Sequence, residues 1–249
     1  MKTQYRDLTV VPLNADEDLV IACDSSAGIG AKSADAVSVA PEIMAAYAVR
    51  VPLLELLCVG VNLLAAVDTI GNEMEPTGRQ LIWGVRQELA QAGYPDLPLN
   101  GSTEDNMPTT TTSLGITLIG RLAKTAWRPQ TTEPLQVYQL GDPYVGDDVV
   151  AHLADIFSYD VIKKLRRFKG VQDLLPVGSK GMRYELGQMA QTQAHPMIHW
   201  QVPEDAAQLD QSAGPATVAL VGVKRSRAAA IEAAFPELKR LAELEVADV

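Results

Sequence analysis

The sequence has few cysteines, few aromatic residues and no long uninterrupted apolar run. Its 249 residues include only Cys23 and Cys58, which form neither a disulfide framework nor a metal-binding pattern. We therefore expect a reduced, cytoplasmic protein. Aromatic residues make up 5% of the chain, so Leu, Val, Ile and Ala must supply most of the core. The longest apolar stretch, residues 51–67, is broken by polar residues, a glycine and a proline, so no membrane span or signal peptide is expected.

The chain is also short of basic residues. Lys and Arg number 21 against 31 Asp and Glu, which gives a net charge of −10. This balance argues against nucleic acid or an anionic membrane as the main partner and favours a small-molecule substrate. The chain is 47% hydrophobic and 21% charged, which is typical of a folded globular protein, and its length suits one large domain or two modest ones.

Apolar spacing predicts an α/β (α+β) protein in which strands and helices alternate in both halves. A polar segment with two prolines, residues 127–134, predicts a boundary between a domain at 1–128 and a smaller one at 129–249. The proline at position 52 predicts a kink or a break in the first helix, and Thr77 and Gly93 are the expected ends of the second. The expected strands are 19–24, 65–70, 113–120, 135–141, 197–202 and 216–223, and the expected helices are 41–60, 77–92, 147–169, 182–193 and 225–247.

Acidic residues in the first half lie at strand ends or on a helix face. Polyphosphate chemistry needs carboxylates to hold Mg²⁺, and backbone N–H groups or a lysine to hold phosphate. The turn from Gly28 to Gly30 would let the backbone approach a phosphate, and Lys32 would add positive charge. Each acid taken alone is better explained as a solvated loop residue, and only their order and spacing together favour a metal site. The acids in question are Asp24, Glu55, Asp68, Glu104 and Asp105.

One stretch, "NGSTEDNMPTTTT" at residues 100–112, joins two of these acids to a run of four threonines. It is either a solvated connection or a loop that binds metal and polyphosphate. A second candidate is "VGSKGMRYE" at 177–185, where Ser179 and Lys180 precede an expected helix. A helix N-terminus with a lysine is a candidate anion or substrate site, and an ordinary capped helix is the alternative.

Four segments, "D…GIGAK", "LELLCVGVN", "AAVDTI" and "LNGSTEDNMP…SLGITLIG", together resemble the ATP-binding fold of the aminoimidazole ribonucleotide synthetase superfamily. Thiamine monophosphate kinase and selenophosphate synthetase are members of that superfamily. The resemblance implies an ATP- and Mg²⁺-binding domain at 1–128 whose mixed sheet pairs across a homodimer, and a C-terminal substrate domain at 129–249. By the same resemblance, the stretch at 100–112 is the metal and phosphate loop.

The resemblance also implies roles for individual residues. Asp24, Lys32 and Glu104 are the expected catalytic residues. The expected metal ligands are Asp24, Glu55, Asp68, Glu104 and Asp105. Together with the helix signal at 179–180, the expected nucleotide-binding residues are Gly28, Gly30, Lys32, Asn100, Gly101, Thr103, Ser179 and Lys180.

Two positions depart from the superfamily pattern. Ser102 stands where an acid is usual, so either Glu104 or Asp105 substitutes for it or one metal ion is missing. Leu54 stands where a polar ligand is usual, which leaves Glu55 alone.

Three functions follow as hypotheses. The first is an ATP-dependent small-molecule kinase. The segments "CDSSAGIGAK", "NGSTEDNMPTT" and "LLPVGSKGMRYE" are similar to those of a bacterial subgroup, the α-ribazole kinases, which implies phosphorylation of the 5′-hydroxyl of α-ribazole in cobalamin salvage. The second is an ATP-dependent synthetase that activates an amide or carboxyl oxygen. The third is a nucleotide-binding regulator without catalysis.

Overall fold

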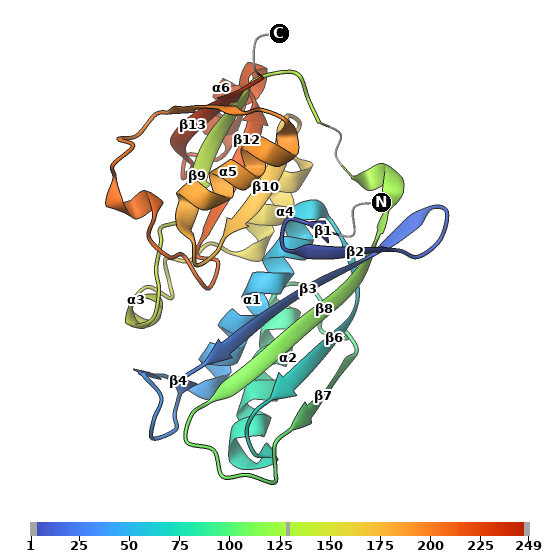
Figure 1. The fold of residues 1–249 in the computed structure, drawn as a ribbon, viewed down its shortest axis with the longest axis vertical. Coiled ribbons are helices and arrows are strands. Elements are labelled where there is room, and N and C mark those ends of the chain that lie inside the picture. The colour runs from blue at the N-terminus through green and yellow to red at the C-terminus, as the bar shows by residue number, and fades with distance from the viewer. Residues whose placement is uncertain (1–3, 128–129, 247–249) are drawn as a thin grey trace. The chain divides into compact units, whose positions relative to one another are not determined.

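The structure is a computed structural model that describes residues 4–127 and 130–246 (Figure 1). The chain divides into two compact units. Unit 1 holds Met1–Leu56 with Val61–Lys124, and unit 2 holds Leu57–Gly60 with Thr125–Val249. Each unit has its own sheet, so the expected α/β class is confirmed. In the described ranges, no helix combines the length and the apolar character that a membrane crossing needs.

Unit 1 is built on a six-stranded sheet. Its neighbouring strands are antiparallel except β6 and β7, which are parallel, so the sheet is mixed. The long central strand β8 lies between β3 and β6 and pairs with both along most of its length. The strands, in spatial order, are β1 (Gln4–Tyr5), β2 (Leu8–Pro12), β3 (Glu17–Ala27), β8 (Ser113–Ala123), β6 (Asn62–Ile70) and β7 (Leu99–Thr103).

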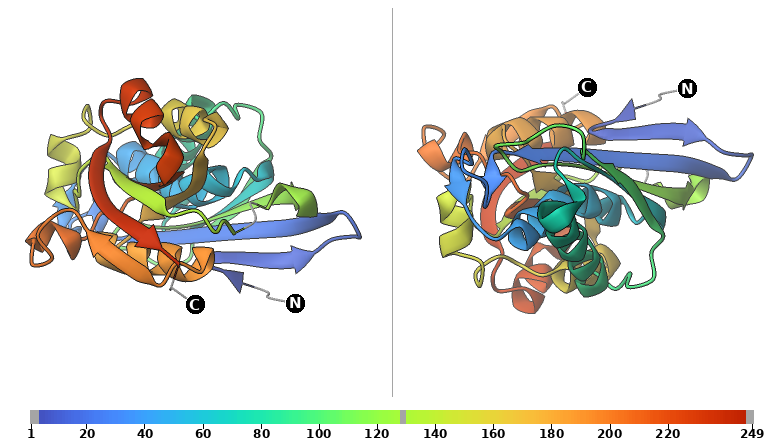
Figure 2. Two further views of the ribbon diagram at one scale, coloured as in Figure 1. Left: turned by 90° about the horizontal axis from the view of Figure 1, so that it is seen from above. Right: turned by 90° about the horizontal axis from the view of Figure 1, so that it is seen from below.

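Two helices, α1 (Pro41–Val59) and α2 (Arg79–Gln91), lie on one face of this sheet (Figures 1 and 2). They approach closely at Gly84, where any side chain would collide with the backbone of Glu42. Helix α1 is a single helix that contains Pro52, so the expected division into two short helices is wrong. A short π-helical segment, η1 (Met74–Gly78), leads from β6 into α2.

A small parallel ladder connects β3 to α1. Strand β4 (Ile29–Gly30) pairs with β5 (Val37–Ser38), and the loop between them carries Lys32 and Asp35. Strand β8 continues into a 3-10 turn, η2 (Lys124–Ala126). The β4–β5 loop lies beside the segment that precedes β8, because the amides of Gly28 and Ala34 donate hydrogen bonds to the carbonyls of Thr112 and Thr110 at 2.9 Å.

Unit 2 is built on a five-stranded antiparallel sheet whose spatial order is β10-β12-β9-β13-β11. Helix α5 (Gly181–Gln193) contributes Leu186 and Met189 to a core shared with Val137 and Leu220 of the sheet. The strands are β9 (Leu135–Leu140), β10 (Val171–Val177), β11 (Met197–Trp200), β12 (Val218–Lys224) and β13 (Lys239–Glu245). The other helical segments are α3 (Asp147–Ala151), α4 (Tyr159–Arg167), η3 (Ala207–Leu209), η4 (Arg225–Arg227) and α6 (Ala228–Ala234).

Three expectations about local structure are wrong. The closing helix at 225–247 is only the turn η4 and the short α6, and residues Lys239–Glu245 form strand β13. The helix expected at 147–169 is two helices, α3 and α4. Residues 99–103 form a strand, so Asn100, Gly101 and Thr103 are not in a loop.

Candidate functional site

Two of the predicted carboxylates lie on the same face of the unit 1 sheet. Asp24 of β3 and Asp68 of β6 both pair with Ile116 of β8, one from each side. Directly paired residues of neighbouring strands point their side chains to the same face. Ile116 is 1% exposed, so this is the face that the helices cover. Two strand spacings of about 4.8 Å separate the two aspartate backbones.

The surroundings of both aspartates disfavour a bare negative charge. Burial raises the pKa of Asp24, and a hydrogen bond from the Ser25 amide opposes that effect. Burial also raises the pKa of Asp68, which is 3% exposed, and the positive charge of Arg86 opposes it. A divalent cation would relieve this desolvation, so oxygen donors in such a place suit Mg²⁺.

The residue of β7 that pairs with Asp68 is a glycine, Gly101, for a steric reason. The two residues pair in the parallel ladder of β6 and β7. A side chain at position 101 would occupy the space that the Asp68 carboxylate fills. Glycine at position 101 therefore allows Asp68 to keep its position.

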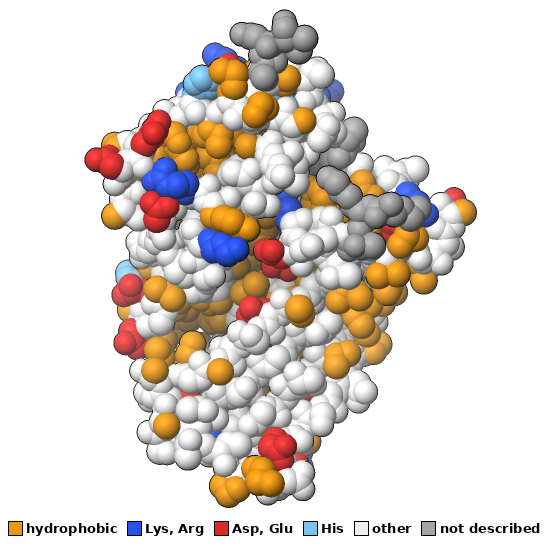
Figure 3. Space-filling view, viewed as in Figure 1, with side chains coloured by type: hydrophobic (Ala, Val, Ile, Leu, Met, Phe, Trp, Pro, Cys, Tyr) orange, Lys and Arg blue, Asp and Glu red, His pale blue; other side chains and the backbone are white. Residues whose placement is uncertain are grey.

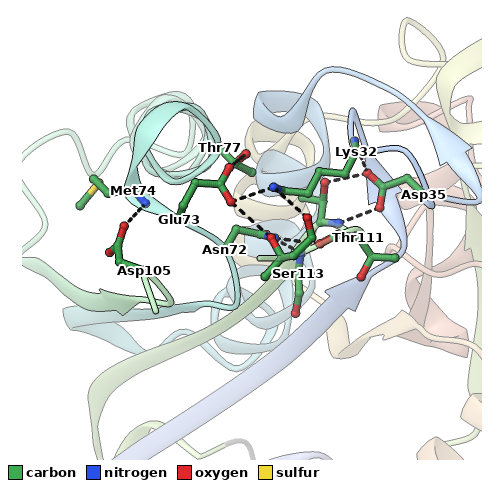
Figure 4. A network of polar contacts seen from close by, with 11 residues as sticks. Lys32, Asp35, Asn72, Glu73, Met74, Thr77, Asp105, Thr111 and Ser113 are labelled. Carbon is green, nitrogen blue, oxygen red and sulfur yellow. Dashed lines mark hydrogen bonds and ion pairs between the residues drawn. The ribbon is translucent and has the colours of Figure 1, made fainter. Parts of the chain in front are cut away.

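A second polar group centres on Lys32 (Figure 4). Its ammonium donates to Glu73 Oε2 at 2.7 Å and to the Thr109 carbonyl at 3.3 Å. Glu73 also accepts hydrogen bonds from the hydroxyls of Thr77, at Oε1, and Thr109, at Oε2. The hydrogen bond from Lys32 is the largest cause that lowers the pKa of Glu73 to about 2. Glu73 is therefore ionised at neutral pH and forms an ion pair with Lys32.

Asp35 fixes the backbone of the β4–β5 loop. Its Oδ2 accepts from the Lys32 amide at 2.8 Å and from the Thr112 hydroxyl at 2.7 Å, and its Oδ1 accepts from the Thr112 amide at 2.7 Å. Partial burial raises the pKa of Asp35, but the two bonds from Thr112, the bond from the Lys32 amide and the Lys32 charge together outweigh it, and the pKa is lowered. Gly30 faces this contact, and a side chain there would collide with Thr112.

Asn72, which is fully buried, holds the threonine run from the other side. Its Nδ2 donates to Thr109 Oγ1 and to the Thr111 carbonyl, both at 2.8 Å, and its Oδ1 accepts from the Ser113 amide at 2.8 Å. The run is therefore a tightly bonded segment and not a solvated connection. Its hydroxyls and carbonyls form hydrogen bonds with the loop that carries Lys32 and Asp35.

The two acids after β7 bond within their own loop. Asp105 accepts from the Met74 amide at 2.9 Å and from the Thr103 hydroxyl at 2.6 Å, and these bonds, the Thr103 bond first, lower its pKa. Glu104 Oε1 accepts from the Asn106 amide at 2.8 Å. Over residues 4–127 and 130–246, no three side chains of His, Cys, Asp or Glu are grouped as metal ligands. The five-acid metal set therefore stays a prediction, and of its members the structure pairs only Asp24 and Asp68 on one face.

Three residues of this region were not found from the sequence: Asp35, Asn72 and Glu73. The pair Asn72-Glu73 follows the end of β6 after one glycine, in "VDTIGNE", which is a position where polar residues often contribute to a functional site. Asp35 lies three residues after Lys32, and its carboxylate accepts a hydrogen bond from the Lys32 amide. The position of Asn72 and Glu73 near a strand end, and that of Asp35 close to Lys32, were the sequence signals that pointed to this region.

The predicted residues of unit 2 lie before α5. Lys180 Nζ lies 4.1 Å from the centre of the Tyr184 ring, and no side chain caps the helix. Gly181 has a positive φ of 78° and lies against the backbone of Leu209 and Asp210. Arg183, one turn into the helix, pairs with Asp210 at 2.8 Å. Ser179 and Lys180 are exposed, and their role in binding stays a prediction.

The chain matches no protein-family model and no curated protein. It is similar in structure to several solved proteins. AaThiL complexed with AMPPCP and TMP has a TM-score of 0.67 at 12% identity, over 100% of this chain and 87% of that one. Thiamine-monophosphate kinase from Stenotrophomonas maltophilia K279a has a TM-score of 0.66 at 12% identity, over 98% and 90%.

T. maritima PurL complexed with ATP has a TM-score of 0.62 at 13% identity, over 96% of this chain and 42% of that one. The chain therefore spans less than half of PurL but most of AaThiL and of the thiamine-monophosphate kinase. These likenesses show that the chain has the α/β fold of these solved structures. The α/β fold that the sequence resemblance implied is thus confirmed.

Proposed function

We propose that this chain binds ATP with Mg²⁺ and transfers the γ-phosphoryl group to a hydroxyl of a small molecule. The observation that carries the proposal is the pair of desolvated carboxylates, Asp24 and Asp68, held in one register across β8. Phosphoryl transfer needs little covalent chemistry from the protein, and it depends on positioning and on neutralising the phosphate charge.

The donor set fits Mg²⁺ in part. Asp24 and Asp68 offer carboxylate oxygens whose charge is poorly solvated, and Glu55 of α1 is the third expected ligand. Glu104 or Asp105 joins them only if its carboxylate leaves the loop bonds that it makes here. When bound, Mg²⁺ would neutralise charge on the phosphates.

The phosphates would meet the backbone around Gly28 and the ammonium of Lys32. Gly28 has a positive φ of 74°, and no atom lies within 4 Å of the place where its side chain would be. A phosphate oxygen can therefore approach the backbone there. The side chain of Lys32, which follows this turn, is 18% exposed. Asn100, Gly101 and Thr103 of β7 are the further expected contacts in unit 1, and Ser179 and Lys180 are those in unit 2.

We propose that the acceptor is the 5′-hydroxyl of α-ribazole, bound by the domain at 129–249. The support for this substrate is the resemblance of three segments, "CDSSAGIGAK", "NGSTEDNMPTT" and "LLPVGSKGMRYE", to those of α-ribazole kinases. One similar structure is named a thiamine-monophosphate kinase, and another, AaThiL, is complexed with AMPPCP and TMP. A synthetase that activates an amide or carboxyl oxygen is the second candidate, because PurL complexed with ATP shares the fold.

We further propose that the working form is a cytoplasmic homodimer joined through the open face of the unit 1 sheet. Leu19 and Ile21 of β3, Val67 of β6 and Ile119 of β8 alternate with the buried residues of their strands and are partly exposed. Figure 3 shows apolar side chains on this face, gathered toward its right-hand side. A second copy would cover them. Cys23 and Cys58 are both free thiols, as a reducing compartment requires.

The experiment is incubation of the chain with ATP, Mg²⁺ and α-ribazole, followed by mass spectrometry. A kinase yields ADP and an acceptor heavier by one phosphoryl group. Asp68→Asn, which keeps the size of the side chain and removes its charge, should abolish this product. A panel of other nucleosides and of phosphate monoesters tests the acceptor class. ADP and free phosphate with an amide or carboxylate substrate, and no phosphate ester, would favour the synthetase. Failure to bind ATP would refute both.

A further inference from the structure

The contact between Lys32 and Glu73 joins two loops of unit 1 that are far apart in sequence. The ammonium of Lys32, between β4 and β5, lies 2.7 Å from Glu73 Oε2, just after β6. Their side chains are 18% and 29% exposed, so the pair is largely screened from water by the protein. Figure 4 shows both side chains pointing toward each other beside the threonine run.

Glu73 is held in place by groups other than Lys32. The Thr77 hydroxyl donates to its Oε1, and the Thr109 hydroxyl donates to its Oε2 at 3.3 Å. Thr109 is in turn fixed by Asn72, which is fully buried. The carboxylate is therefore a fixed point, and the flexible four-carbon side chain of Lys32 is the partner that it orients.

The ammonium of Lys32 retains the capacity to bind another anion. A lysine ammonium has three N–H donors. Among the described residues, two acceptors lie within hydrogen-bond distance of Nζ, which are Glu73 Oε2 and the Thr109 carbonyl. One N–H is thus left to donate to a third acceptor, and its direction is set by the other two bonds.

We propose that Glu73 is a positioning residue that orients the Lys32 ammonium toward a phosphate of the bound nucleotide. The inference rests on the proposed function, because it takes the phosphate site from it. In this arrangement a phosphate joins the Lys32–Glu73 pair and does not replace it. Glu73 acts only through Lys32, and touches neither the phosphate nor a metal ion.

A double-mutant cycle in nucleotide affinity tests the proposal. The dissociation constant of AMPPCP is measured calorimetrically with Mg²⁺ on the full chain. Lys32→Met should weaken binding about thirtyfold, because a charge-assisted bond to phosphate is lost. Glu73→Gln should weaken it about tenfold, because the amide no longer fixes the ammonium. In the Lys32→Met background, Glu73→Gln should have no further effect.

Glu75→Gln is the matched control. Glu75 lies two residues away on the same segment and forms an exposed ion pair with Arg79 outside the network. This variant should bind AMPPCP like the original chain. Melting temperatures of all variants are recorded alongside, because a purely structural role for Glu73 would lower the melting temperature and leave the affinity unchanged.

Each other outcome overturns the inference. Tighter binding by Glu73→Gln would show that Glu73 competes with phosphate for Lys32. Additive losses in the double variant would show that Glu73 acts directly, for example on Mg²⁺. If the original chain binds no AMPPCP, the proposed function itself fails. If the original chain binds and Lys32→Met binds equally well, only the role of Lys32, and with it that of Glu73, is refuted.

Discussion

Gly101→Ala is the most direct test of how β7 supports Asp68. The methyl group would overlap the Asp68 carboxylate and lie close to the Asp68 carbonyl oxygen. Asp68 is 3% exposed and lies between two strands, so its carboxylate has little room to move. Forcing a methyl group into such a packed place costs about 1–3 kcal/mol.

We therefore expect Gly101→Ala to lower the free energy of unfolding by about 2 kcal/mol. Urea denaturation followed by circular dichroism measures this change. Turnover of ATP should fall as well, because Asp68 must shift from its position opposite Ile116. In an Asp68→Ala background the same substitution should cost less, since only the carbonyl contact remains.

Gly187→Ala is the control of opposite sign. Gly187 lies within helix α5, and no atom lies within 4 Å of its missing side chain. Alanine there should stabilise the chain by about 0.5–1 kcal/mol, because glycine is a poor helix former. The reasoning is refuted if Gly101→Ala leaves stability within about 0.5 kcal/mol of the original chain.

Three further predictions follow from the site and the sheet. The pKa of Glu73 is lowered to about 2 from 4.5, so its contribution to stability is complete above pH 4.5 and is lost as the pH falls toward 2. The free energy of unfolding of Glu73→Gln should therefore change less with pH in that interval than that of the original chain. Glu104→Ala combined with Asp105→Ala should sharply raise the Mg²⁺ concentration needed for ATP turnover. Thr111→Val should raise it less, because Asn72 bonds to the carbonyl of Thr111 and not to its hydroxyl. If the dependence of ATP turnover on Mg²⁺ is unchanged in the double variant, these two acids are not metal ligands. Light scattering at micromolar concentration should give the mass of a dimer, and Ile119→Glu on the open sheet face should give that of a monomer; a monomeric original chain would contradict the proposed assembly.

The sequence was sufficient for the elements with clear periodicity. Strands β3, β6, β8, β9 and β12 were predicted because apolar residues recur in them as short runs or alternate positions. Helices α1, α2 and α5 were predicted from helical spacing. Strand β13 was missed because "KRLAELE" follows a helical segment and contains good helix formers, so local propensity opposed the strand that pairing with β9 and β11 stabilises.

The candidate site was predictable only in its parts. Asp24, Asp68 and Lys32 were identified by residue type and by a resemblance, but the shared register of the two aspartates depends on β8, which lies more than 40 residues beyond Asp68 in the chain. Glu73 and Asn72 were missed because neither stands in a periodic element, and their partners Thr109 and Thr111 are 36 and 39 residues away. Non-local hydrogen bonds of this kind leave no local pattern in a sequence.

The position of β8 has a consequence for the order in which the chain folds. Strands β3 and β6 both need β8 as their neighbour, yet β8 is the last strand of the unit 1 sheet to leave the ribosome. Until then, β3 and β6 have no partner between them, and the Asp35–Thr112 contact, across 77 residues, cannot close. Such late, long-range pairing slows folding and leaves nascent strand edges open to aggregation. While residue 112 is the last to have emerged from the ribosome, a protease should therefore cut the nascent chain readily, and the emergence of the next dozen residues should make unit 1 resistant in one step.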